Sequence, residues 1–469
     1  MPRAVDYITL LPEGKPGPSL VYAGAWREDV TYLNVHIFSC DITKCPKTAQ
    51  KCVLSAYQKG VDTLKGIEYL RNKLPNYRPG AIKRQRIYDL KQKDIEPGIT
   101  IPPEIRRQYR STLGWCAKAV DALADRLVFR EFENDNFMIN DIFMMNSADI
   151  FFDDAITSAL INSVSFVYIS EGDEGIPRLQ VIEGSEATGI LDPITRLLTE
   201  GYVVLTRDEY GNPEDELHLL PYRTDLYRNG DLKDSWTHNV GHPLLVPIIH
   251  RPNATKPFGR SRITGSAVYW QRNAKRTLER ADIASEFYSF PQKYVIGLSQ
   301  DAEPLESWKA TISSMLQFTK DEEGDSPKLG QFQQQSMAPF TEQLKNAASG
   351  FAGETGLTLN DLGFVTENPS SAEAIKASHE TLRVQARKAQ RDFGSGFLNV
   401  GYLSACLRDN FDYKRSQFYQ TKAKWEPVFE PDSSTISLVG DGAIKVNQAI
   451  PGYFDKNNIR DLTGIEGAE

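Results

Sequence analysis

Apolar side chains recur at helical spacing along much of the chain, most clearly in the stretch that ends at Phe393. The apolar positions of that stretch are Ile375, Leu382, Ala386, Ala389 and Phe393. They follow the three-to-four-residue period of an α-helix, and no Gly or Pro interrupts residues 372 to 391. The basic residues lie on another face: Lys376, Arg383, Arg387 and Arg391. The pattern predicts a long amphipathic helix, whose basic face is by default a solvated surface.

The start of this helix is strongly specified. Pro369 holds the residue before it in an extended conformation. Ser370 suits the N-cap, and Glu373, three residues later, can bond back to the cap amide, which makes a capping box. Before it comes a glycine-containing turn, and before that a short alanine-containing helix over residues 339 to 350.

Four further helices are expected from the apolar spacing. They cover residues 56 to 74, 115 to 129, 142 to 164 and 263 to 288. The Pro- and Gly-containing residues 75 to 80 should end the first one. In the last one Arg272, Arg276 and Arg280 stand four residues apart, which predicts one basic stripe along the helix.

Between these helices the period of the pattern changes to that of strands. Strands are expected at residues 164 to 169, 178 to 182, 202 to 206, 216 to 222, 235 to 238 and 246 to 250. Asn229 and Gly230 form the strongest hairpin signal among the intervening turns. An antiparallel meander of about 80 residues follows from this spacing. Another strand is expected at residues 293 to 298, followed by a small acidic α/β insertion reaching residue 330, so the fold class is α+β.

Composition and charge refine this picture. The 469 residues are enough for several domains, and 25% charged residues indicate a globular chain with a net charge of −8. No apolar run is long enough for a membrane span, so a soluble, unexported protein is expected. Charge is segregated: residues 131 to 160 carry seven acidic and no basic side chains, whereas residues 256 to 280 carry seven basic and one acidic. Such alternating blocks suit a subunit whose neighbour is another copy of itself.

Catalytic motifs are missing from the sequence. It contains no phosphate loop, no H-E-x-x-H and no nucleophile elbow. Asp149, Asp153 and Asp154 could bind Mg²⁺ in a nuclease, but their positions on the expected helix fit an acidic surface better. The cysteines fit reduced thiols; a zinc site formed by Cys40, Cys45 and Cys52 with His36 nearby is a weak alternative. No enzyme, metal or cofactor is therefore expected.

Several phrases in this order resemble the portal proteins of tailed bacteriophages, in the branch typical of long, non-contractile tails. They are Tyr168 after the Ala-Leu-Ile helix, RP at residues 251 to 252, PFGRS at 257 to 261, PQKY at 291 to 294 and NPSSAEAI at 368 to 375. The resemblance covers roughly residues 60 to 450. The chain departs from the family pattern at residues 1 to 55 and in its short C-terminal region.

The resemblance implies an arrangement of named parts. They are a wing at residues 56 to 260, a first stem helix at 261 to 290, a clip at 291 to 337, a second stem helix at 338 to 352, a tunnel loop at 353 to 370, the wing and long helix at 371 to 424, and a reduced crown at 425 to 469. The loop would face DNA through Gly353, Gly356, Asn360, Asp361, Gly363, Thr366 and Asn368. The arginine stripe of the first stem helix would line the channel or meet a neighbouring subunit.

The resemblance also implies a function and its partners. The protein would form a ring, usually of twelve subunits, at one vertex of the virion capsid, through which double-stranded DNA is packaged and ejected without sequence specificity. Expected partners are the terminase large subunit, head-completion or adaptor proteins, and the major capsid and scaffolding proteins, with assembly in the host cytoplasm and no membrane. The alternatives are a metal-dependent nuclease and a head-to-tail adaptor or other capsid scaffold.

Overall fold

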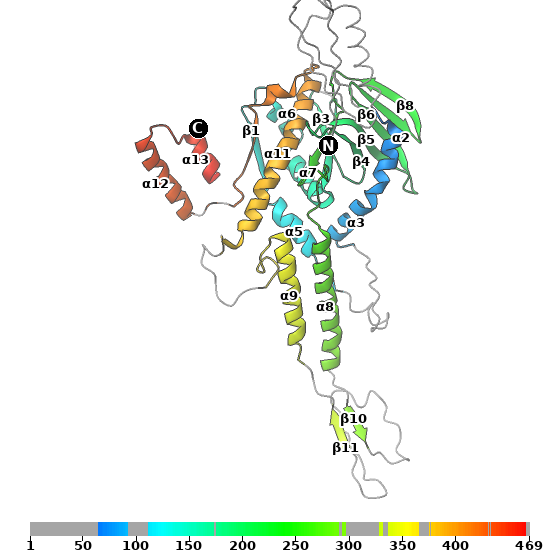
Figure 1. Ribbon diagram of the computed structural model, residues 1–469, viewed down its shortest axis with the longest axis vertical. Helices are drawn as coiled ribbons and strands as arrows, with labels where there is room; N and C mark the ends of the chain where they lie inside the picture. The colour runs from blue at the N-terminus through cyan, green and yellow to red at the C-terminus, as the bar shows by residue number, and fades with distance from the viewer. Residues whose placement is uncertain are drawn as a thin grey trace, which may run out of the picture. The chain divides into compact units, whose positions relative to one another are not determined.

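The computed structural model describes residues 64–91, 111–172, 175–289, 293–296, 328–331, 336–364, 375, 377–429, 431 and 433–465. The helices are α2 (Ile67–Lys73), α3 (Arg78–Tyr88), α5 (Trp115–Ala124), α6 (Ile139–Met145), α7 (Ala148–Asn162), α8 (Gly265–Ser289), α9 (Ala338–Thr355), α11 (Glu380–Arg408), α12 (Ser433–Ala449) and α13 (Lys456–Thr463), with short 3-10 turns at Leu74–Asn76 and Arg415–Phe418. Helices and strands are both abundant, so the expected mixture of α and β structure is confirmed (Figure 1).

The strands form four antiparallel sheets in the described part of the chain. Their bounds are β1 (Phe129–Glu133), β2 (Val164–Ser170), β3 (Arg178–Ile182), β4 (Ala187–Leu191), β5 (Leu198–Arg207), β6 (Pro213–Leu220), β7 (Arg223–Arg228), β8 (Asp231–Thr237), β9 (Leu245–Ile249), β10 (Lys293–Ile296), β11 (Lys328–Gln331) and β12 (Lys422–Trp425). The strand orders are β3-β2-β9, β4-β5-β6-β7-β8, β1-β12 and β10-β11.

The single meander expected from the sequence is thus divided between two sheets. The three-stranded sheet is buried at β9 and partly exposed at β3: every residue of β9 is buried, and α7 and α11 both pack against β2. The five-stranded sheet is a true meander whose last strand, β8, is exposed along its whole length. Its β7–β8 turn contains Asn229 and Gly230, with φ of 50° and 91°. Both residues therefore adopt the left-handed conformation that the hairpin signal predicted.

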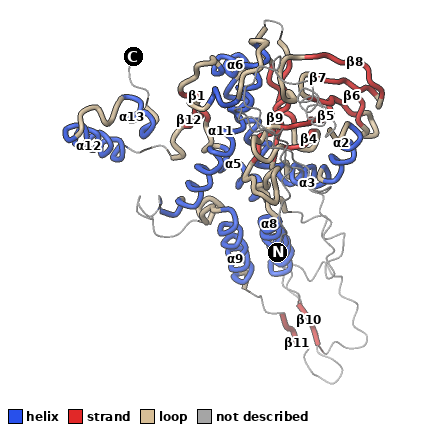
Figure 2. Tube along the Cα trace, turned by 45° about the horizontal axis from the view of Figure 1, so that its top comes forward, coloured by secondary structure: helices blue, strands red, loops and turns tan. Residues whose placement is uncertain are grey.

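The small helix α2 covers part of the five-stranded sheet and lies beside β4 and β5 (Figures 1 and 2). Leu70 and Leu74 pack there against Tyr202 and Val204 in a cluster separate from the main core. Polar bonds reinforce the contact, because the buried carboxylate of Glu200 accepts hydrogen bonds from the Lys65 and Gly66 amides at 2.8 and 2.9 Å.

The main core joins the three-stranded sheet, the β1–β12 ribbon and the surrounding helices. Its centre is a group of aromatic rings from β1, α6, α7, α11 and β12: Phe129, Phe132, Phe143, Phe151, Phe152, Phe397 and Trp425. The β1–β12 ribbon was not predicted. It pairs residues far apart in the chain, such as Phe129 with Trp425, and no local pattern announces such a pairing.

Several helix boundaries differ from the expectation for identifiable reasons. The helix expected at residues 142 to 164 is broken into α6 and α7, because Ser147 has a φ of 54° and Asn146 bonds to the distant Leu179 amide at 2.9 Å. The helix expected at residues 115 to 129 ends at Ala124. The chain restarts as α3 at Arg78, within the predicted breaker, since Pro79 lies in the first turn, where it costs no hydrogen bond.

Candidate functional site: a helix pair, a glycine turn and a basic helix

The helices α8 and α9 run side by side and form a closely packed pair (Figure 1). Gly350 on α9 lies directly against the ring of Trp270 on α8, so the backbone of one helix approaches the indole of the other. Ala347, Ala348 and Phe351 are buried in the same part of α9. At the body end, the Thr264 hydroxyl donates a hydrogen bond to Glu354 at 2.8 Å. Small residues on α9 therefore set the spacing of the pair.

The three arginines of the predicted stripe have different surroundings. Arg276 and Arg280 are exposed on α8, whereas Arg272 is half-buried. Arg272 lies near Cys116, whose pKa is raised to about 12 by burial in spite of the neighbouring positive charge. A single, equally exposed basic stripe is therefore not what the structure contains. Of the three arginines, Arg276 and Arg280 are the exposed ones.

A turn containing two left-handed glycines follows α9. Gly356 ends the helix with a φ of 75°, and Gly363 has a φ of 88°. Gly353, expected in a loop, lies instead within the last turn of α9, which continues to Thr355 because nothing interrupts it before Gly356. Of the other expected loop residues, Asn360 is exposed, and Thr366 and Asn368 lie outside the described residues.

Asp361 is used within this turn. Its carboxylate accepts hydrogen bonds from the Thr358 amide at 2.8 Å and the Thr358 hydroxyl at 2.9 Å. Its other neighbour is His379, just before α11, at 3.9 Å. Leu357 is buried, and the apolar side chains that follow it pack against the core, so this part of the loop is anchored to the body.

The long basic helix, α11, begins at Glu380 in a described segment that is already helical at residues 377 and 378. The expected buried face is confirmed for Leu382, Ala386, Ala389 and Phe393, all at most 1% exposed. Ile375 departs from it, being 47% exposed. The helix continues to Arg408, well past the expected end. The capping residues Ser370 and Glu373 lie outside the described residues.

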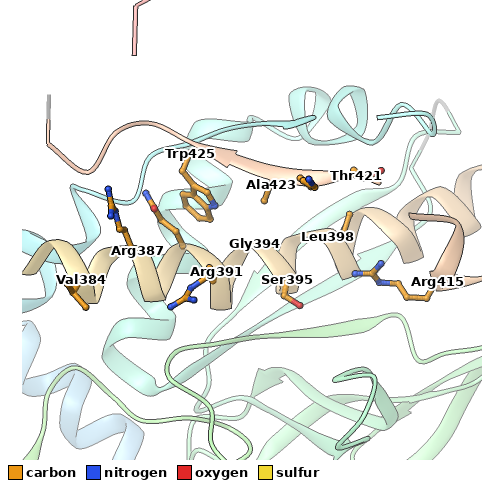
Figure 3. A pocket seen from close by; sticks show the side chains of 12 residues that line it. Val384, Arg387, Arg391, Gly394, Ser395, Leu398, Arg415, Thr421, Ala423 and Trp425 are labelled. Atoms are coloured by element: carbon orange, nitrogen blue, oxygen red, sulfur yellow. The ribbon is translucent and has the colours of Figure 1, made fainter. Parts of the chain in front are cut away.

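The basic face of α11 is partly neutralised within the chain. Arg383 pairs with Glu380 at 2.6 Å, and Lys376 lies outside the described residues. Arg387 and Arg391 are exposed and border a hollow of about 730 Å³ between α11 and β12 (Figure 3). β12 can cross the helix closely only because residue 394 is glycine, where a β-carbon would come within 2.9 Å of the Ala423 side chain.

One residue that the sequence patterns did not single out connects these elements. Arg262, just before α8, is 5% exposed and donates hydrogen bonds from all three guanidinium nitrogens. The acceptors are the Ala119 carbonyl at 3.1 Å, the Thr355 carbonyl at 2.7 Å and the Gln385 side chain. They belong to α5, the end of α9 and α11, so one side chain ties the helix pair to the long helix.

Burial lowers the pKa of Arg262 to about 10, with a smaller effect from Arg251, yet the group stays charged at neutral pH. The Thr355 carbonyl is one of the last of α9, where the helix dipole is negative, so a cation is favoured there. The sequence indicates the position of Arg262 only as an arginine between a predicted turn and a predicted helix. An arginine exposed at a helix start gives the same signal.

The candidate nuclease residues lie on α7. Asp149, Asp153 and Asp154 are exposed on that helix. Across the part of the chain that the structure describes, no group of three or more His, Cys, Asp or Glu side chains is arranged to hold a metal ion. The cysteines proposed for zinc, with His36, lie outside the described residues. None of the described helices has the length and apolar character that a membrane crossing requires.

Two known proteins that are similar to this chain in sequence are both portal proteins of mycobacteriophages. The portal protein of Mycobacterium phage L5 is 25% identical over 383 residues, covering 76% of this chain and 77% of its own length. The portal protein of Mycobacterium phage D29 is 22% identical over 413 residues, covering 81% of this chain and 82% of its own length. No family model matches the chain.

Among solved structures, a chain in the neck of an empty gene transfer agent particle is 13% identical, with a TM-score of 0.39, and covers 76% of this chain and 90% of its own. A chain in the virion of a native gene transfer agent particle is 11% identical, with a TM-score of 0.38, and covers 84% of this chain and 99% of its own. Each of the two phage relatives covers more than three quarters of this chain, so over most of its length the chain is similar to bacteriophage portal proteins.

Proposed function

We propose that this chain forms the portal ring of a tailed phage, a channel of twelve subunits at one capsid vertex through which DNA enters and leaves. The observation that carries the proposal is the similarity to two portal proteins over 76% and 81% of the chain. The described fold agrees with it, because the chain leaves a mixed α/β body along α8, contributes strands β10 and β11, and returns along α9.

Each part of the ring subunit is proposed to match one described region. The three-stranded and five-stranded sheets with their helices belong to the wing, α8 and α9 are the stem, and β10 with β11 belongs to the clip. The second stem helix extends to Thr355, so the tunnel loop starts at Gly356 and α11 lies behind it. The helices α12 and α13 take the place of a reduced crown.

A channel for DNA must hold the duplex and still let it slide. Each phosphate neutralised by a fixed cation adds affinity, which acts as a brake, so few cations should face the DNA. The net charge of −8 and the exposure of only two arginines along the described part of α8 agree with this requirement. Arg276 and Arg280 are therefore proposed to line the channel or the contact between stems.

In the tunnel loop, Asn360 is proposed to make weak contacts with DNA, together with Thr366 and Asn368. Asp361 also lies in this loop, and its carboxylate accepts hydrogen bonds from Thr358. Its role is to hold the turn in shape, while the left-handed Gly356 and Gly363 let the chain change direction at both ends of the turn.

The partners follow from the position of a portal in the virion. The clip is proposed to dock the terminase large subunit during packaging and head-completion proteins afterwards, and the wing to contact capsid and scaffolding proteins during assembly in the host cytoplasm. The protein itself is proposed to have no catalytic activity, since ATP hydrolysis belongs to the terminase.

The test is to purify the full-length protein and view it by negative-stain electron microscopy, with mass photometry to count subunits. Rings with a central hole are expected, and a stable monomer at high concentration would contradict the proposal. ATPase and metal-dependent nuclease assays should read at background for the wild type and for Asp153→Ala alike. Cleavage that the substitution abolishes would instead support the nuclease.

A further inference from the structure

A groove along α11 combines positive charge with an apolar floor. Its cations are Arg387, Arg391, Arg415 and Lys422, and its apolar lining residues are Val384, Leu398, Ala423 and Trp425. No carboxylate lines it. We call this surface the basic groove. Arg387 and Arg391 project from neighbouring turns of α11, and Trp425 reaches in from β12 (Figure 3).

Within the described part of the chain, carboxylates outside the lining of the basic groove offset part of its charge: Glu380 interacts electrostatically with Arg387, and Asp392 with Arg391. Among the described residues, none of its four cations forms an ion pair, although Arg383 on the same helix does. Arg415 donates instead to the neutral side chain of Asn399, at 2.8 Å. A hollow of about 730 Å³ whose lining carries four cations and no carboxylate is a surface suited to an acidic partner.

The apolar floor narrows the class of partner. A DNA backbone offers phosphates but no apolar side chains, so it would leave Trp425 and its neighbours facing water. A protein surface that carries both carboxylates and apolar side chains would cover the floor and pair with the cations at once. The groove therefore fits a protein rather than a duplex.

The same chain exposes such a surface at the junction of α6 and α7. Three long apolar side chains stand out there, with Met144 71% exposed, Met145 65% and Ile150 73%. Asp153 and Asp154 are exposed one turn further along α7. We call this surface the acidic corner. It lies in the segment from residue 131 to 160, which has no basic residue.

The acidic corner has a fixed shape. Asn146 donates hydrogen bonds to the carbonyls of Ile142 and Pro177 at 2.7 and 2.9 Å, and it also accepts one from the Leu179 amide. These bonds hold the sharp turn between α6 and α7 against strand β3. Exposed methionines on a rigid corner lose little conformational freedom of the backbone when a partner covers them.

The carboxylates of the corner also repel one another. Burial raises the pKa of Asp154, and the negative charge of Asp153 adds a smaller effect in the same direction. Burial, and then the charges of Asp121 and Asp153, raise the pKa of Asp125, which follows α5, although the nearby Arg126 opposes the shift. No described basic residue forms an ion pair with Asp153 or Asp154. A cationic neighbour would relieve this repulsion.

We propose that, in the ring, the basic groove of each subunit receives the acidic corner of the next subunit. The inference rests on the proposed ring, and it names the surfaces that close it. Every subunit carries one groove and one corner, so the contact is heterologous: each copy binds one neighbour through its groove and the other through its corner. Repetition of such a contact closes into a ring when the rotation allows it.

The test reverses the charge of each surface in the full-length protein. The groove variant is Arg387→Glu with Arg391→Glu, and the corner variant is Asp153→Lys with Asp154→Lys. Each variant alone brings like charges together, so the concentration for half-assembly should rise at least tenfold by mass photometry. Mixed in equal amounts, the two variants should form rings again, because the groove of each then matches the corner of the other.

Rings from the mixture should contain the two variants in alternation, at a ratio of one to one by native mass spectrometry. A control variant, Lys233→Glu with Lys256→Glu, makes the same charge change as the groove variant at exposed positions elsewhere and should assemble as the wild type does. Circular dichroism of each variant checks the fold.

Variants that assemble normally, or a mixture that fails to restore rings, would overturn the inference while leaving the portal ring intact. A wild-type protein that stays monomeric would overturn both.

Discussion

A β-carbon added to Gly350 of α9 would come within 2.4 Å of Cε2 of Trp270 on α8. The two helices are therefore held at a distance that only glycine permits at this position. The indole ring fills the space between them, and its neighbour Tyr269 packs edge-on against it with ring centroids 5.1 Å apart.

Gly350→Ala should push the helices apart and lower the melting temperature. Alanine favours a helix by up to about 1 kcal/mol, but overpacking against a rigid ring costs about 1–3 kcal/mol, so the clash wins. The matched control is Gly353→Ala on the same helix, where nothing lies within 4 Å of the added β-carbon. Thermal denaturation should show a loss for the first variant and no loss for the second. Equal melting temperatures would mean that the helix pair adjusts freely.

Arg262 should be among the most sensitive single positions of the described chain. Arg262→Met removes three hydrogen bonds and leaves the carbonyls of Ala119 and Thr355 buried without this donor, a cost on the order of 3 kcal/mol. Arg262→Lys keeps the charge but cannot reach all three acceptors, so it should be only slightly less harmful. Urea denaturation should show a lower midpoint for both.

The control for this position is Arg260→Met, two residues away on an exposed side chain, which should change stability by less than about 0.5 kcal/mol. If Arg262→Met unfolds at the same urea concentration as the control, the guanidinium does not join the helix pair to the body.

The sequence predicts features whose cause is local and misses those whose cause is distant. Asn229 and Gly230 announce their hairpin because the left-handed conformation is a property of these residues themselves. The break between α6 and α7 depends on Asn146 reaching the Leu179 amide, 33 residues away, and the β1–β12 ribbon pairs Phe129 with Trp425. The partners in these contacts are too far apart in the chain for the local spacing of apolar residues to indicate them.

The same distinction applies to the candidate site. The buried and exposed faces of α11 follow from its periodicity, and Arg387 and Arg391 are exposed as that periodicity indicates. Arg272 and Arg280 look equivalent in the sequence, but only Arg272 is half-buried, because α5 lies beside it. Asp361 closes a turn with Thr358, three residues away, a contact that the sequence pattern did not indicate. Tertiary packing decides such cases.

Asp461 should tether the C-terminal helices to the β1–β12 ribbon. It lies 2.8 Å from Arg130 and also pairs with Lys424, and Arg460 lies 3.7 Å from Glu131. Asp461→Asn should increase hydrogen exchange in α13 but lower global stability by no more than about 1 kcal/mol, because the pairs are partly exposed and screened. Raising the salt concentration should also increase hydrogen exchange in α13 of the wild type, because salt screens these ion pairs.

The matched control is Asp441→Asn, on the exposed surface of α12, which should leave exchange in α13 unchanged. Unaltered exchange in Asp461→Asn would show that apolar contacts alone hold these helices in place.

His250 should make stability fall with acidity between pH 7 and pH 5. The ring is 2% exposed at the end of β9; its Nδ1 lies 2.7 Å from the Arg260 carbonyl, and the ring stacks near Phe393 of α11. Burial lowers the pKa of His250 to about 3, although the bond to the Arg260 carbonyl opposes the shift, and the charges of Arg262, Arg251 and Lys388 add to it. The folded protein therefore keeps this ring neutral throughout this pH range.

The unfolded chain behaves differently, since its histidine takes up a proton below about pH 6.5. Between pH 6.5 and pH 3 the unfolded state binds more protons, so stability rises with pH in that window and is constant above it. From pH 7 to pH 5 the wild type should lose about 2 kcal/mol that His250→Gln does not lose. His238, whose pKa burial lowers to about 4, adds a similar slope to both proteins, so it cancels in the comparison. Urea denaturation of both proteins at pH 5, 6 and 7 measures the difference, and parallel pH dependences would show that the ring is protonated in the folded state.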